Sequence, residues 1–149
     1  MNPCPFGYWR TGVRECRCSD GTVARYQGRL SGPLLDRIDL HVEVPHIDVD
    51  ELHSSRREET SAEVRERVAR VREHRARLGP LPLARAATEM LARASRQFAM
   101  STRAIERTTA VARTVAHLAA QREVSAAHVA EALQFRSTRE LERACNQST

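Results

Sequence analysis

From Thr60 onward the sequence is a series of short stretches with helical periodicity, and this feature most limits the folds open to the chain. Thr60 and Glu63 have the spacing of a capping box, and Val64, Val68 and Val71 then recur along one helix face. Only 4% of the residues are aromatic, so a core has to be built from Leu, Val and Ala, which suits a small helical bundle. We therefore predict a mainly α fold.

Four antiparallel helices are predicted in this half, and together they form a small bundle over residues 60–149. Ser101 and Ser125 are the expected N-caps of the third and fourth helices, and Val124 and Val129 have the spacing of a hydrophobic staple. The helices are expected over about 60–79, 83–98, 101–121 and 125–135. The positions expected to face inward are Ala87, Leu91, Ala94, Phe98, Ile105, Ala112, Val115, Ala116, Ala119, Val129, Ala132 and Leu133.

Residues 1–45 have a different pattern and are predicted to be a separate part. Ser19 and Asp20 are placed to cap a helix over about 21–30. A short helical turn beginning at Pro33 follows, and then a half-buried strand in which Leu40, Val42 and Val44 alternate with polar residues. Residues 46–59 are polar and acidic without a period, so they are predicted to be a linker.

The charge of the chain is carried by arginine alone. All 24 Lys+Arg residues are arginine; residues 61–149 hold 16 of them against 9 acidic residues, and residues 1–60 hold 8 against 10. The absence of lysine excludes a phosphate-loop lysine and a Schiff-base lysine. Arginine instead suits bidentate contacts with phosphate or carboxylate. The sequence has neither a membrane-length apolar run nor a signal peptide, so we expect a cytoplasmic protein.

Three cysteines near the start of the sequence are candidate metal ligands. In a cytoplasmic chain, ligation of a metal such as zinc by Cys4, Cys16 and Cys18 is favoured over a disulfide. A tetrahedral zinc site needs four ligands, and the position that would pair with Cys4 is occupied by Phe6. The fourth ligand would have to be His41, His46, Cys145 or water. Unligated thiols are an equally open interpretation.

Two arginines stand at positions suited to binding an anion. Arg37 lies at the elbow before the predicted strand, and Arg103 lies in the first turn of a predicted helix, where the helix dipole favours negative charge. The alternative for each is an ion pair, Arg37 with Asp39 or Arg103 with Glu106. The histidines and serines form no pattern typical of nucleophilic catalysis.

Several longer motifs cover nearly the whole chain. They are Asn2-Pro3-Cys4-Pro5-x-Gly7-Tyr8, Glu15-Cys16-x-Cys18, Tyr26-x-x-Arg29-Leu30-Ser31-Gly32-Pro33-Leu34-Leu35-Asp36-Arg37-Ile38-Asp39-Leu40-x-Val42-Glu43-Val44-Pro45, Ser101-x-Arg103-Ala104, Ala112-Arg113-Thr114-Val115-Ala116 and His128-Val129-Ala130-Glu131-Ala132-Leu133. Through them the chain resembles the C-terminal part of the magnesium-chelatase-like AAA+ ATPases of bacteria, of the ComM (YifB) type. The resemblance implies the end of an α/β ATPase core over 1–45 and a helical lid domain over 60–149.

The resemblance also implies roles for single residues. Asn2 matches the sensor-1 position, which helps to orient the water that attacks ATP. Arg37 matches the arginine finger, which acts in trans on ATP held by a neighbouring subunit, and Arg103 matches sensor 2, which contacts the γ-phosphate. The family uses ATP with Mg²⁺ and forms hexameric rings that remodel single-stranded or branched DNA in branch migration and transformation. Phe6 replaces a cysteine of the family's CxC…CxC set.

The sequence also departs from this family, because it contains neither the phosphate-binding lysine loop nor the acidic Mg²⁺-holding motif. We therefore expect no ATP hydrolysis by this chain alone. It is interpreted as a truncated product, a split-gene fragment or one half of a site, with ATPase core subunits of the same family as partners in a homo- or hetero-oligomeric ring. Two alternatives remain open: a stand-alone basic helical module that binds DNA or protein, and a non-functional remnant.

Overall fold

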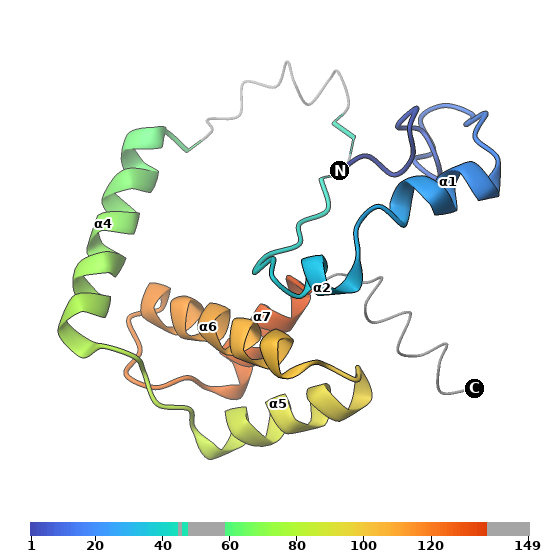
Figure 1. Cartoon of the computed structure of the whole chain (residues 1–149). Helices are drawn as coiled ribbons and strands as arrows, with labels where there is room; N and C mark the ends of the chain where they lie inside the picture. The colour runs from blue at the N-terminus through green and yellow to red at the C-terminus, as the bar shows by residue number, and fades with distance from the viewer. Residues whose placement is uncertain (45, 48–58, 137–149) are drawn as a thin grey trace. The chain divides into compact units, whose positions relative to one another are not determined.

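The structure is a computed structural model that describes residues 1–44, 46–47 and 59–136. It is mainly helical, which confirms the predicted fold class. The described helices are α1 (Asp20–Gln27), α2 (Gly32–Leu35), α4 (Ser61–Leu78), α5 (Arg85–Gln97), α6 (Thr102–Leu118) and α7 (Ala126–Gln134) (Figure 1). None of these helices combines the length and the apolar character needed to cross a membrane.

The chain divides into two compact units. Unit 1 contains Met1–Leu35 and a segment that begins at Glu43, and unit 2 contains Asp36–Val42 together with helices α4 to α7. Arg37 therefore belongs to unit 2, together with its neighbours on both sides. The boundaries expected from the sequence, 1–45 and 60–149, stay a prediction.

Unit 1 is built around α1. The side chain of Ser19 accepts a hydrogen bond from the Thr22 backbone, as the predicted N-cap requires, and Val23 is buried. The helix ends at Gln27, earlier than expected, because the Gly28 backbone amide caps it by donating to Ala24. The Gln27 side chain also donates to the Pro3 carbonyl over 2.8 Å, which ties the N-terminal loop to α1.

The strand expected over 40–44 is not formed in the described part of the chain. Leu40, Val42 and Val44 are 50%, 66% and 79% exposed, so the prediction of a half-buried strand is wrong here. Alternating apolar residues make a strand only when a neighbouring strand takes up the backbone hydrogen bonds. The His41 amide instead donates to the Phe135 carbonyl, and the one described β-bridge joins Leu83 to Val124.

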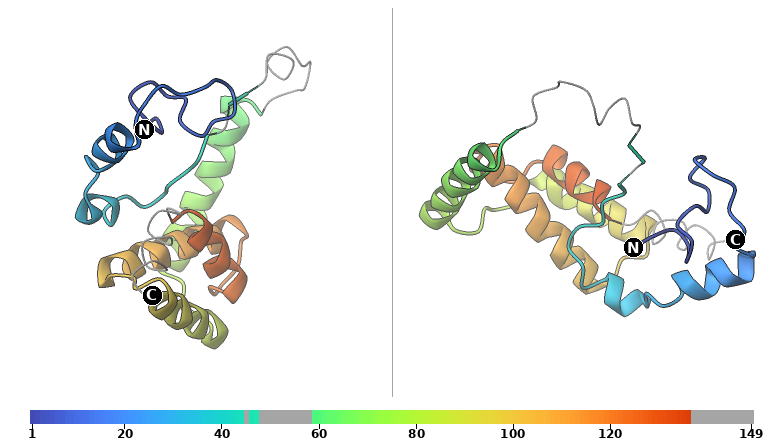
Figure 2. Two further views of the ribbon diagram at one scale, coloured as in Figure 1. Left: turned by 90° about the vertical axis from the view of Figure 1, so that its right-hand side faces the viewer. Right: turned by 90° about the horizontal axis from the view of Figure 1, so that it is seen from above.

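The ends of helix α4 agree with the prediction from the sequence, but its packing does not. Thr60 and Glu63 form both hydrogen bonds of the capping box, and the helix stops before Gly79, whose φ is +64°. No residue of α4 is buried, and Val64 and Val68 are 37% and 41% exposed. Figures 1 and 2 show α4 leading away from the helices α5, α6 and α7.

The core of unit 2 lies between α5, α6 and α7. The buried residues of this core are Leu81, Ala87, Leu91, Ala112, Ala116, Val124, Val129 and Ala132, and all but Leu81 come from the predicted inward faces or the predicted staple. Ala119 is exposed, contrary to prediction, because α6 ends at Leu118 and Ala119 is its C-cap. The described core is thus formed by three helices, with α4 outside it.

Two connections hold this core together. Before α5 and before α7 the backbone is paired at Val124, whose carbonyl accepts a hydrogen bond from the Ala84 amide and whose amide donates to the Pro82 carbonyl. At the start of α7, the His128 side chain accepts a hydrogen bond from the Ser125 amide over 3.1 Å and so caps the helix. His128 is therefore a capping residue of α7.

Candidate functional site

The residues on either side of Arg37 are attached to the helices of unit 2. Asp36 accepts a 2.6 Å hydrogen bond from the hydroxyl of Ser101, which is the N-cap of α6. The same hydroxyl oxygen accepts a hydrogen bond from the Ala104 amide over 3.1 Å. Arg37 itself is exposed. The start of α6 and the segment that carries Arg37 are thus joined by a side chain.

A buried arginine reinforces this attachment. Arg136 is only 4% exposed; its Nη1 donates to the Ile38 carbonyl over 3.2 Å, and its Nη2 lies 3.7 Å from the Asp36 carboxylate. A buried guanidinium is tolerated only where a carboxylate and hydrogen-bond acceptors compensate the loss of hydration. Sequence reasoning missed Arg136, because nothing in the local pattern marks an arginine as buried.

Two further contacts hold the next residues of the segment. Arg107 of α6 pairs with Asp39 over 3.2 Å, and the His41 amide donates to the Phe135 carbonyl over 2.7 Å. Asp39, which the sequence offered as a partner for Arg37, thus has Arg107 as an ion-pair partner. The segment from Asp36 to His41 is bonded to α6 and to the end of α7 along its length.

Arg103 lies in the first turn of α6, two residues after Ser101. Its side chain is exposed and forms no hydrogen bond or ion pair in the part of the chain that the structure describes, so the alternative pair with Glu106 is not present there. Unpaired backbone amides and the helix dipole favour an anion at this end of the helix. The guanidinium of Arg103 adds a formal positive charge at the same place.

Asn2 belongs to unit 1, whereas Arg37 and Arg103 belong to unit 2. The Asn2 side chain lies beside Gly7, where an added Cβ would come within 3.8 Å of its Nδ2. Gly7 has a φ of +82°, a conformation that glycine adopts without strain, so the backbone of this turn favours glycine.

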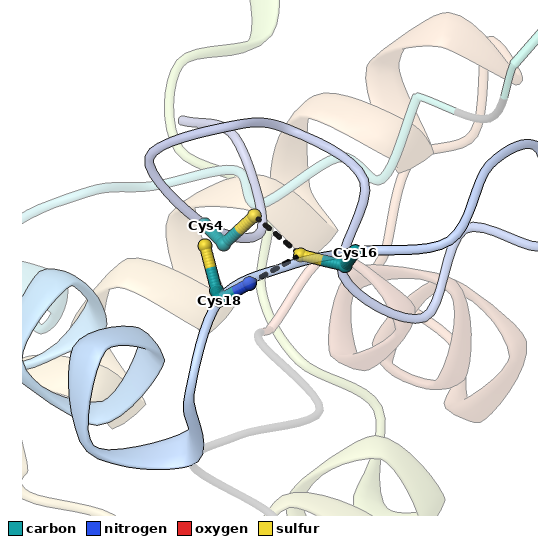
Figure 3. Close-up of side chains that lie close together, drawn as sticks. All are labelled: Cys4, Cys16 and Cys18. Atoms are coloured by element: carbon teal, nitrogen blue, oxygen red, sulfur yellow. Dashed lines mark hydrogen bonds between the residues drawn. The ribbon is translucent and has the colours of Figure 1, made fainter.

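The three cysteines of unit 1 do converge (Figure 3). The Sγ atoms of Cys4, Cys16 and Cys18 all lie within 4.8 Å of one another, and those of Cys4 and Cys16 are 3.6 Å apart. Cys4 is fully buried, although it lies in a turn-rich loop, and the Cys18 amide donates to the Cys16 sulfur. The CxC spacing and the distant Cys4 thus form one group.

The geometry of this group shifts the pKa values of Cys4 and Cys18 in opposite directions. Burial acts to raise the pKa of Cys4, but hydrogen bonds from the Trp9 backbone and from the other two thiols outweigh it and bring the pKa to about 7. Burial and the neighbouring thiols raise the pKa of Cys18 to about 11. A low thiol pKa is characteristic of sites that bind metals or react with electrophiles.

Three thiols at these separations fit a zinc ion with little adjustment. Zn–S bonds of about 2.3 Å in a tetrahedron place the sulfur atoms about 3.8 Å apart. Among the described residues, the side chains close enough to bind one metal ion together are these three thiols, and neither His41 nor His46 is part of the group. Cys145, the other candidate for the fourth ligand, lies outside the described residues. Phe6 occupies the position at which a cysteine would form a second CxC pair with Cys4, and its side chain is 68% exposed. The donor set therefore suits a three-thiolate site with an open fourth position.

Unit 2 also contains a cavity of about 700 Å³ that was not predicted from the sequence. Asp39, Arg75, Arg113, His117 and Glu131 line it together with apolar residues of α6 and with Phe135, the C-cap of α7. His117 is buried, and its Nδ1 lies 3.1 Å from Nδ1 of His74 on α4. Burial lowers the pKa of His117, and the charge of the neighbouring His74 lowers it further.

Comparison with known proteins gives two adjacent family matches. The family described as magnesium chelatase, subunit ChlI, matches residues 1–52, and the family described as magnesium chelatase, subunit ChlI C-terminal, matches residues 58–136. Competence protein ComM of Haemophilus influenzae is 38% identical over 152 residues. An uncharacterized Mycobacterium tuberculosis protein is 36% identical, and the uncharacterized YifB of Salmonella typhimurium is 33% identical. Each match covers 92% of this chain and 30% of the relative, so the chain spans less than a third of the length of these proteins.

Proposed function

The chain belongs to the magnesium chelatase subunit ChlI family, of the ComM/YifB type, and from this premise we propose that it supplies γ-phosphate-sensing groups to an oligomeric ATPase. Residues 1–45 form the end of the ATPase core in this proposal, and residues 60–149 form the lid. The observation that carries it is the hydrogen bond from Ser101, the N-cap of α6, to Asp36, because it joins the residue before Arg37 to the helix whose first turn contains Arg103.

Each of the proposed site residues has one role. Arg37 is the arginine finger, which reaches ATP bound by a neighbouring subunit, and its exposure supports this role. Arg103 is sensor 2, and Asn2 is the sensor-1 residue that orients the attacking water. An arginine that meets the transferring phosphoryl group contributes roughly 10³–10⁵ in rate, so Arg37 has the largest expected effect.

Neighbouring subunits of the same family complete the ATP site in this proposal. The chain contains no lysine, so the phosphate-binding loop and the groups that hold Mg²⁺ have to come from a core outside these 149 residues. Such a ring would use ATP with Mg²⁺ to remodel DNA, in line with the word competence in the name of one relative. The net positive charge of residues 61–149 supports contact with phosphate backbones.

We also assign zinc to the thiols of Cys4, Cys16 and Cys18. A bound zinc ion would supply structural cross-linking, because it joins parts of a loop that has little core of its own. The three cysteines hold the N-terminal loop, which contains Asn2, against the start of α1. Their role is therefore to position that loop.

The proposal is tested by adding this chain to a full-length relative whose own finger arginine has been replaced. The ComM protein of Haemophilus influenzae is suitable because it matches 92% of this chain. If the chain enters the ring, ATP hydrolysis rises with the amount added, passes through a maximum and then falls as complete cores become scarce. An ATPase rate that does not change at any ratio would contradict the proposal.

A further inference from the structure

We propose that Asp36 and Arg136 are positioning residues that fasten the segment carrying Arg37 to the first turn of α6. The proposal rests on the roles given above to Arg37 and Arg103. It adds two residues, Asp36 and Arg136, that act by positioning Arg37 and not by contacting ATP. Its consequence is that the arginine finger moves with the helix that carries sensor 2. A change at one subunit's γ-phosphate is then transmitted to the finger that serves its neighbour.

The burial of Arg136 supports this positioning role. A charged side chain that is 4% exposed needs compensation, and Arg136 finds it in the Ile38 carbonyl and the Asp36 carboxylate, which lie on either side of Arg37. Arg136 directly follows the C-cap of α7, Phe135. The end of α7 therefore holds both flanks of the proposed finger.

The Asp36 carboxylate bridges two elements. One oxygen faces Arg136, and the other accepts the Ser101 hydrogen bond at the N-terminus of α6. A carboxylate there is also stabilised by the helix dipole. Arg103 is two residues further along α6, so a displacement of this helix end is carried through Ser101 to Asp36 and on to the backbone of Arg37.

The attachment to the helices continues beyond Arg37. Asp39 pairs with Arg107, and the His41 amide donates to Phe135. Contacts on both sides of Arg37 leave its backbone little freedom to move independently of α6 and α7. This matters for catalysis, because a misplaced charge about 1 Å from its productive position can reduce a rate on the order of 10²-fold.

The attachment itself is tested on this chain by amide hydrogen exchange of His41, whose backbone proton is bonded to Phe135. We expect Asp36→Asn and Arg136→Met to speed this exchange by about tenfold or more, while the amides of α6 and α7 stay protected. Arg93→Met, which changes an exposed arginine of α5, is the matched control and leaves the exchange unchanged. If Arg136→Met also speeds amide exchange in the core, the variant has disturbed the fold, and the result for Asp36→Asn is then used to test the attachment. The Asp36 side chain lies outside the core, so this variant should leave the core intact. Unchanged His41 exchange in Asp36→Asn would overturn the attachment.

The catalytic consequence is tested in the mixed assembly with the finger-deficient relative. Asp36→Asn should lower kcat about tenfold or more without changing the KM for ATP, because the ATP is held by the neighbouring core. If Arg37→Ala lowers kcat and Asp36→Asn does not, the positioning proposal is wrong and the proposed function stands. If Arg37→Ala also has no effect, the proposed function is wrong, and the exchange measurement still decides whether Asp36 holds the segment.

Discussion

At the scale of single residues, the chemistry of this chain is concentrated in arginine and cysteine. Arg103 is exposed at a helix end, Arg37 lies on a segment held at both sides, and three thiols converge in unit 1. The candidates could be found from the sequence because spacing and motif mark them. Arg136 could not, since a buried arginine is defined by distant partners such as Ile38, 98 residues away.

The open position of the thiol group gives a prediction for residue 6. Phe6→Cys restores a second CxC pair and should tighten zinc binding, and the loss of an exposed phenyl ring costs the fold little. Cys4→Ser should abolish zinc binding, because it removes the ligand whose pKa is lowered to about 7. The measurement is competition for zinc with a chromophoric chelator. Equal affinities for the three proteins would show that these thiols do not hold zinc.

At the scale of secondary-structure elements, α4 behaves differently from α5, α6 and α7. The latter three bury the faces that their periodicity predicts, whereas α4 buries none of its residues. Periodicity tells which face of a helix is apolar but not which surface covers it. For the same reason the residues from Leu40 to Val44 alternate like a strand and yet have no partner strand in the described chain.

Because α4 lacks buried residues, its stability depends on its ends. Thr60→Ala removes the side-chain cap and half of the capping box, and it should cost about 1 kcal/mol of local helix stability. The loss should appear as faster amide exchange in the first turns of α4, with no change in α5 to α7. Ser61→Ala, one residue further on, is the control. Equal exchange in Thr60→Ala and Ser61→Ala would contradict the assigned cap.

The contact between α4 and α6 should depend on pH through His117. Burial and the nearby His74 lower the pKa of His117 in the folded protein below its ordinary value of 6.5. The unfolded chain therefore takes up a proton at this histidine before the folded protein does, and stability falls as the pH drops through about 6.5. The urea midpoint of unfolding should be lower at pH 5.5 than at pH 7.5. His117→Leu should reduce this difference; an undiminished difference would assign the pH dependence to other groups.

At the scale of the whole molecule, the chain matches two adjacent family regions and spans about 30% of the length of its ComM relative. The sequence predicts the helical fold class and the family, because both depend on local patterns and motifs. It does not predict that Asp36–Val42 belongs to the helical unit, since that grouping arises from contacts between Asp36, Ser101 and Arg136. These contacts place the proposed finger on the body that also carries Arg103.

The central claim is that Arg37 acts on ATP bound by another subunit, and substitutions at this one position test it most directly. The measurement is the kcat for ATP hydrolysis by mixtures of this chain with the finger-deficient ComM relative. We predict that the original chain restores hydrolysis, that Arg37→Ala does not, and that Arg37→Lys restores only a small part, because lysine lacks the planar fork that contacts two phosphate oxygens. Restoration by Arg37→Ala equal to that by the original chain would contradict the account.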